Sequence, residues 1–171
     1  MIMAYRNKTY VAFDGDNDIR YYNLMKAWKQ SDNTDFNFYD AHDLNTALDT
    51  STEETIKRRL RERMENSKVF VLLVGNSTKN LRKPYVRYEI DHAINYYKIP
   101  IIVVNLNGLR KCDDNLCPPA ARDTLAIHIP FGNKIMQYAL ENWPASHTNY
   151  IGEGKTGAYH YNESVYTNLG L

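Results

Sequence analysis

Polar segments rich in carboxylates follow the apolar runs that the sequence predicts to be strands. The run at residues 9–13 is followed by DGDND, and the run at 36–39 is followed by DAHDLNT. The run at 68–74 leads through GNSTKNLRKP into a helical pattern that carries Glu89. Ligands of a parallel sheet bind beyond the carboxyl ends of its strands, so we expect these segments to share one rim. If the chain is an enzyme, we expect its working acid to be Glu89.

The helical pattern around Glu89 predicts where its side chain points. Successive residues of a helix turn by about 100°, and one apolar stripe should therefore face the sheet: Val86, Ile90, Ala93 and Tyr97. Glu89 lies about 80° from the centre of that stripe, beside Tyr85. The helix dipole favours its charge and partial burial disfavours it, so two effects on its pKa oppose each other. An ordinary exposed or capping glutamate is the alternative that the pattern leaves open.

The acidic loop after the first strand has other interpretations. Asp14, Asp16 and Asp18 could bind a cation, but no Glu follows at EF-hand spacing, and so few carboxylates on one loop bind Mg²⁺ only weakly. Asp16 or Asp18 could instead cap a helix that begins near Ile19.

Two cysteines, Cys112 and Cys117, lie in the sequence CDDNLC. No second pair and no histidine close in sequence accompany them, so free loop thiols are favoured over a zinc site. We therefore expect no metal site.

The elements that position these residues alternate along the chain. Nearly continuous apolar runs at 68–74 and 99–106 are typical of strands that are covered on both faces. Shorter runs at 9–13, 36–39 and 125–129 complete five predicted strands, and helical patterns occupy 19–29, 51–66, 85–97 and 134–142. This alternation predicts a single α/β domain over residues 1–145 with a parallel sheet. Residues 146–171, rich in Tyr, Gly and Asn, are predicted to form an irregular tail.

The composition excludes several partners. Lys plus Arg total 21 and Asp plus Glu total 20, so the net charge does not favour nucleic acid. The helix at 51–66 carries a basic run, but interleaved glutamates favour a solvated face with ion pairs. The apolar runs are too short to span a membrane, and with only two cysteines and no apolar N-terminal region we expect a cytoplasmic protein.

Three segments in order carry a family resemblance: YVAFDGDNDIRYYNLMKAW, EETIKRRLRERMENSKVFVLLVGNSTKN and PYVRYEIDHAINYYKIPIIVVNL. They resemble the TIR-like domain of the Thoeris antiphage ThsB family over residues 9–143. The resemblance implies a flavodoxin-like three-layer sandwich with strand order 2-1-3-4-5. It also implies cleavage of NAD⁺ between nicotinamide and ribose, with Glu89 as the catalytic carboxylate. NAD⁺ would be the substrate, and no separate cofactor is implied.

Family members are thought to convert the ADP-ribose product into a cyclic or conjugated signal that activates a partner effector. A phage-derived trigger and a homo-oligomeric state are further expectations. Substrate-binding candidates lie on the same rim: Phe13, Asp14, Asp16, His42, Tyr85, Arg87 and Tyr88. The aromatic residues could exclude water, the two aspartates could orient ribose hydroxyls, and His42 could cover the site. Phe13 in the core, Asp14 in a turn and His42 at the surface are the structural alternatives.

Two departures affect the interpretation. Many TIR enzymes carry a tryptophan shortly before the glutamate, where this chain has Tyr85. No glycine-rich loop follows the first strand, which argues against hydride transfer. A non-catalytic TIR-like interaction module is the alternative function.

Overall fold

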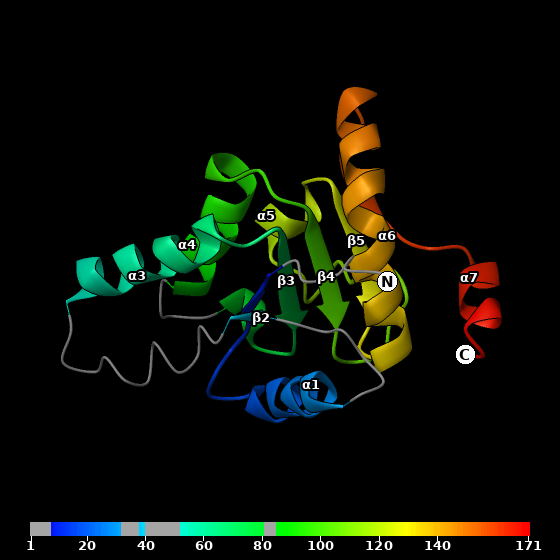
Figure 1. Ribbon diagram of the computed structural model, residues 1–171, viewed down its shortest axis with the longest axis horizontal. Helices are drawn as coiled ribbons and strands as arrows, with labels where there is room; N and C mark the ends of the chain where they lie inside the picture. The colour runs from blue at the N-terminus through cyan, green and yellow to red at the C-terminus, as the bar shows by residue number, and fades with distance from the viewer. Residues whose placement is uncertain (1–7, 32–37, 40–51, 81–84) are drawn as a thin grey trace.

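A parallel sheet of six strands forms the centre of the protein in the computed structural model, which describes residues 8–31, 38–39, 52–80 and 85–171. Every pair of neighbouring strands is parallel, and the arrows of β3 and β4 in Figure 1 accordingly share one direction. The order across the sheet is β2-β1-β3-β4-β5-β6. The strands are β1 (Thr9–Ala12), β2 (Phe38–Tyr39), β3 (Val69–Val74), β4 (Ile101–Asn105), β5 (Ala126–Pro130) and β6 (Ala158–Tyr159).

Helices cover both faces of this sheet (Figure 1). They are α1 (Ile19–Gln30), α3 (Glu53–Glu65), α4 (Tyr85–Asp91), α5 (Pro119–Arg122), α6 (Asn133–Gly152) and α7 (Glu163–Asn168). Successive side chains of a strand point to opposite faces, and this alternation divides the interior into two cores. The α3–α5 core contains Tyr10, Ile56, Leu60, Phe70, Val86, Ile90, Val103 and Cys117. The α1–α6 core contains Val11, Phe13, Tyr22, Val71, Ile102, Ile127, Trp143 and Tyr166. The predicted α/β three-layer fold is thereby confirmed.

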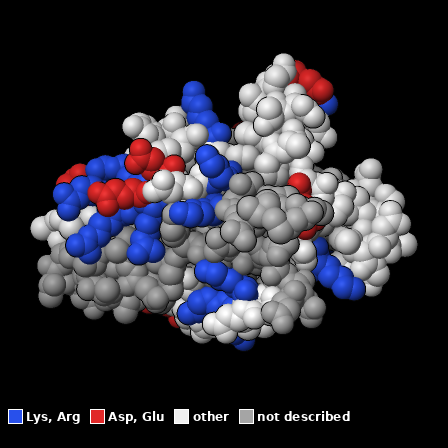
Figure 2. Space-filling view, in the orientation of Figure 1, with Lys and Arg blue, Asp and Glu red and all other residues white. Residues whose placement is uncertain are grey.

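Helix α3 forms as its sequence predicts. The side chain of Thr52 accepts a hydrogen bond from the backbone N–H of Thr55 at 3.2 Å, which caps the helix. Lys57 pairs with Glu53 at 2.7 Å on the outer surface. Figure 2 shows basic and acidic side chains side by side over this helix, so its basic run is a solvated face with ion pairs.

The helix predicted over residues 85–97 changes type along its length. It is α-helical through Asp91 and continues as a π-helical segment, His92–Tyr96. The backbone N–H of Tyr97 donates to the carbonyl of His92 at 2.8 Å, a five-residue step. Lys98 then adopts a φ of 53°, which ends the helix before β4. Such π-helical turns are frequent near functional sites.

The prediction of an irregular tail from residue 146 is wrong. Helix α6 continues through Pro144 to Gly152, β6 pairs with β5, and α7 follows. Proline normally disfavours a helix interior, but α6 continues past Pro144, ten residues beyond the predicted helix end at residue 142. The sequence also did not predict the sixth strand, because β6 is only two residues long. Within the described part of the chain, no helix is both long and apolar enough to cross a bilayer.

Candidate functional site

Glu89 is a buried acid on the sheet-facing side of α4. Only 2% of its surface is exposed, and its helix neighbours Val86 and Ile90 are buried in the α3–α5 core. The angular pattern placed Glu89 at the boundary of this face, and the structure buries it further. The reason is that the carboxyl lies close to Tyr10 of β1, which belongs to the same core.

Burial dominates the protonation of Glu89. Removal from water raises the pKa of Glu89 to about 8, although the nearby Tyr10 hydroxyl acts to lower it. Neither Oε2 of Glu89 nor the Tyr10 hydroxyl has a well-formed hydrogen bond within the described residues. The pKa of Tyr10 is raised as well, first by its own burial and then by the charge of Glu89. Glu89 is therefore mainly protonated at neutral pH in this conformation.

The three other candidates on α4 point in different directions. Tyr88 faces α3, where its hydroxyl accepts a hydrogen bond from Nη1 of Arg61 at 3.0 Å. Its ring lies 5.2 Å from the Nζ of Lys57. Tyr85 is half-buried and packs against the α3–α5 core, whereas Arg87 is exposed. The structure therefore places Tyr85 and Tyr88 on the core that holds Glu89, with Arg87 outside it.

Phe13 lies on the opposite face of the sheet from Glu89. Its ring stacks on Tyr22 of α1, with the ring centroids 4.6 Å apart, in the α1–α6 core. Tyr10 and Phe13 are three residues apart, so strand alternation sends them to different faces. Phe13 thus has the core position that was its structural alternative, and the structure does not bring it beside Glu89.

Asp14 joins the loops that follow β1 and β3. Its Oδ1 accepts from the backbone N–H of Asp16 at 3.0 Å, and its Oδ2 accepts from Nδ2 of Asn17 at 2.7 Å and from the hydroxyl of Ser77. Burial alone would raise the pKa of Asp14, but these hydrogen bonds hold it below its ordinary value. Asp14 is therefore ionised and engaged in the loop, while Asp16 is exposed.

Asp18 is a second buried acid at this rim that the site prediction missed. It occupies the N-cap position of α1, but its side chain makes no capping hydrogen bond. Burial and the charge of Asp14 both raise the pKa of Asp18. Its carboxyl packs so closely on Gly75 that a Cβ there would lie 2.5 Å from Oδ2. The glycine after β3 is the sequence signal that could have indicated this contact.

Two further predictions concern His42 and the two cysteines. His42 lies outside the described residues, so its predicted covering role stays a prediction. Cys112 and Cys117, expected to be free loop thiols without a histidine nearby, lie close to His128 of β5. That histidine is distant in sequence, and only the fold brings it to the cysteines.

Comparison with known families identifies one match. Residues 10–111 match the family described as Thoeris protein ThsB, TIR-like domain. The matched segment includes β1, β3, α4 and β4, and therefore Asp14, Asp18 and Glu89. It covers more than half of the chain and ends just before Cys112.

Proposed function

Because this chain belongs to the TIR-like ThsB family of Thoeris antiphage defence proteins, we propose that it cleaves NAD⁺ and makes an ADP-ribose-derived signal. Glu89 is the proposed catalytic carboxylate. The signal, cyclic or conjugated, would activate a partner effector in defence. The observation that carries this proposal is the burial of a carboxyl group on α4, within the segment that matches the family.

The environment of Glu89 suits stabilisation of a cation. When the bond between ribose and nicotinamide breaks, its electron pair leaves with nicotinamide and positive charge develops on the anomeric carbon. A carboxylate in a medium of low dielectric interacts with that charge more strongly than it would in water. The pKa of about 8 in the resting protein would fall when the cationic nicotinamide ring binds nearby, because opposite charge favours the ionised acid.

The second half of the reaction determines the product. Attack by water on the anomeric carbon yields ADP-ribose, whereas attack by a hydroxyl group of the same molecule yields a ring. In either case the attacking oxygen gives its proton to solvent, so each turnover releases one nicotinamide and one H⁺. Exclusion of water favours the ring, and Tyr85 and Tyr88 are the aromatic residues of α4 that pack on the same core as Glu89.

A carboxyl with 2% exposure cannot contact a substrate unless neighbouring groups move. We infer that the structure corresponds to a resting conformation, and that activation exposes Glu89. A phage-derived trigger, or assembly of several copies of the chain, would supply the free energy for that change. Asp14, which hydrogen bonds at the rim hold in the ionised form, stays a candidate for orienting ribose hydroxyls.

The same burial supports a second candidate function, a non-catalytic interaction module. Glu89 would then be a structural acid, and the helix surfaces would bind partners. Burial of Oε2 without a well-formed hydrogen bond destabilises the protein, and a purely structural role would give no reason to retain that cost. This favours the alternative less.

Product analysis distinguishes the two functions. Purified protein is incubated with NAD⁺, with and without lysate from phage-infected cells, and nicotinamide and nucleotides are measured by mass spectrometry. We expect the infected lysate to induce release of nicotinamide together with an equimolar nucleotide. That nucleotide has the mass of ADP-ribose after hydrolysis and the mass of ADP-ribose less one water after cyclisation. After conjugation it has the mass of ADP-ribose plus the acceptor less one water. Absence of nicotinamide release under both conditions would support the interaction module.

A further inference from the structure

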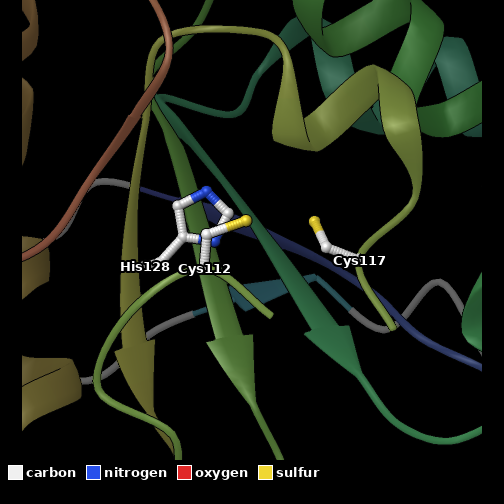
Figure 3. A group of neighbouring side chains, drawn as sticks. All are labelled: Cys112, Cys117 and His128. Atoms are coloured by element: carbon white, nitrogen blue, oxygen red, sulfur yellow. The ribbon is translucent and has the colours of Figure 1, made fainter. Parts of the chain in front are cut away.

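Three potential metal ligands converge beside β5. The thiols of Cys112 and Cys117 and the ring of His128 place one ligand atom each within 4.8 Å of the others. Figure 3 shows the two sulfur atoms turned toward each other, with the imidazole beside Cys112. Cys117 and His128 are fully buried, whereas Cys112 is half-buried.

His128 is an unusual residue for its position. It lies in the middle of β5, whose neighbours Ile127 and Ile129 pack in the α1–α6 core. Alternation along the strand therefore directs the imidazole to the other face, toward Cys117. Neither Nδ1 nor Nε2 has a hydrogen-bond partner in the described part of the chain. Leaving a buried polar group unsatisfied costs about 1–3 kcal/mol, and a bound ion is one of the accepted reasons for finding one.

The loop between β4 and α5 is shaped to present both cysteines. The Asn105 side chain, buried at the end of β4, donates to the carbonyls of Leu109 and Lys111 at 2.9 and 2.8 Å. Asp113 Oδ1 then accepts from the backbone N–H groups of Asn115 and Leu116. These bonds fix the backbone directly before Cys112 and between the two cysteines, so the thiols are held in place by the loop.

We propose that Cys112, Cys117 and His128 bind one zinc ion that fastens the β4–α5 loop to the sheet. Zinc–sulfur bonds of about 2.3 Å and a zinc–nitrogen bond of about 2.0 Å put tetrahedral ligand atoms about 3.5–3.8 Å apart. Donors within 4.8 Å need to approach by about 1 Å, which side-chain rotation provides. Two thiolates and one imidazole are ligands that select zinc over magnesium or calcium.

The charge balance of the site also fits a divalent ion. Each thiol gives its proton to solvent as a Zn–S bond forms, so the two thiolates neutralise the ion in a buried place. Charged or titratable groups around the cluster are Asp113, Asp114, Arg122 and His160. Oδ1 of Asp114 lies 3.7 Å from the Cys112 sulfur, and either this carboxylate or water would supply a fourth bond.

The metal proposal does not rest on the proposed reaction on NAD⁺. Its cysteines and histidine lie beyond residues 10–111, which match the family, so the match does not account for them. A disulfide between the cysteines is the competing outcome, but it would leave both nitrogens of His128 without a partner.

Metal analysis of the full-length chain tests the proposal. Protein without a histidine tag is produced in medium containing zinc, and its metal content is measured by inductively coupled plasma mass spectrometry. We expect one zinc per chain in the wild type, and binding weaker by at least about tenfold in Cys112→Ser and His128→Gln. Cobalt added to metal-free, reduced protein should give a thiolate-to-cobalt charge-transfer band, weakened in Cys112→Ser.

His147→Gln is the matched control, because His147 is a half-buried histidine on α6 outside the cluster. This variant should keep its zinc. Cys112→Ser keeps the proposal testable should His128→Gln fail to fold, since Cys112 is only half-buried. The proposal is overturned if the reduced wild type takes up neither zinc nor cobalt, if both ligand variants retain full zinc, or if the cysteines are found joined as a disulfide.

Discussion

Between about pH 5 and pH 8, wild-type protein should steadily lose stability relative to Glu89→Gln protein. An unfolded glutamate releases its proton near its ordinary pKa of 4.5, whereas the buried carboxyl retains it up to about 8. Between these values the folded state binds more protons, so the free energy of unfolding falls by up to about 1.4 kcal/mol per pH unit. Over the whole pH range, the loss in the free energy of unfolding that Glu89 causes amounts to roughly a few kcal/mol. Urea unfolding at pH 5, 6, 7 and 8 measures it.

The difference between the two proteins isolates Glu89, because the other titrating groups are present in both. Asp91→Asn is the matched control, since Asp91 lies two residues further along α4 and is exposed. Its stability should follow the wild-type pH dependence. If the stability of wild type and Glu89→Gln depends on pH in the same way, Glu89 is charged in the folded protein at neutral pH. That result would contradict protonation of the buried carboxyl.

Replacing Tyr166 with alanine should destabilise the protein by about 3–5 kcal/mol, the cost typical of removing a large buried aromatic ring. Tyr166 lies on α7, is fully buried and packs in the α1–α6 core. The guanidinium of Arg110 lies 4.2 Å from its ring centroid, and Arg110 also pairs with Glu163 at 2.7 Å. These contacts tie the C-terminal segment to the domain. Thermal or urea unfolding of the variant measures the loss.

Tyr96→Ala supplies the comparison for this second prediction. Tyr96 is 71% exposed, and its removal should change the free energy of unfolding by no more than about 0.5 kcal/mol. Tyr166→Phe should retain most of the stability, because the Tyr166 hydroxyl has no hydrogen-bond partner within the described residues. A loss below about 1 kcal/mol for Tyr166→Ala would mean that α7 does not pack as described.

The central fold could be predicted because its signals are local. Nearly continuous apolar runs predicted β3 and β4, and the helical pattern at residues 51–66 predicted α3. The C-terminal segment could not be predicted in the same way. Pro144 argues locally for a helix end, yet tertiary packing of Trp143 in the core sustains the helix beyond it. A two-residue strand such as β6 has no periodicity to detect.

Local signals likewise predicted only part of the candidate site. Helical spacing placed Glu89 near the sheet, but its full burial depends on Tyr10 of a distant strand. Strand alternation in β1 separates Phe13 from Tyr10, but only the fold shows that α4 covers the face of Tyr10. The approach of His128 to the two cysteines depends on the register of β5 against the β4–α5 loop, for which the sequence carries no local signal.

Nicotinamide release by Glu89→Gln and Asp91→Asn, measured beside the wild type after exposure to infected lysate, tests the role of Glu89 most directly. Both variants exchange a carboxylate for an amide on α4, but only Glu89 is buried against Tyr10. We expect Glu89→Gln to release nicotinamide at least about 100-fold more slowly than the wild type, with Asp91→Asn unchanged. Equal rates in all three proteins would contradict a catalytic role for Glu89.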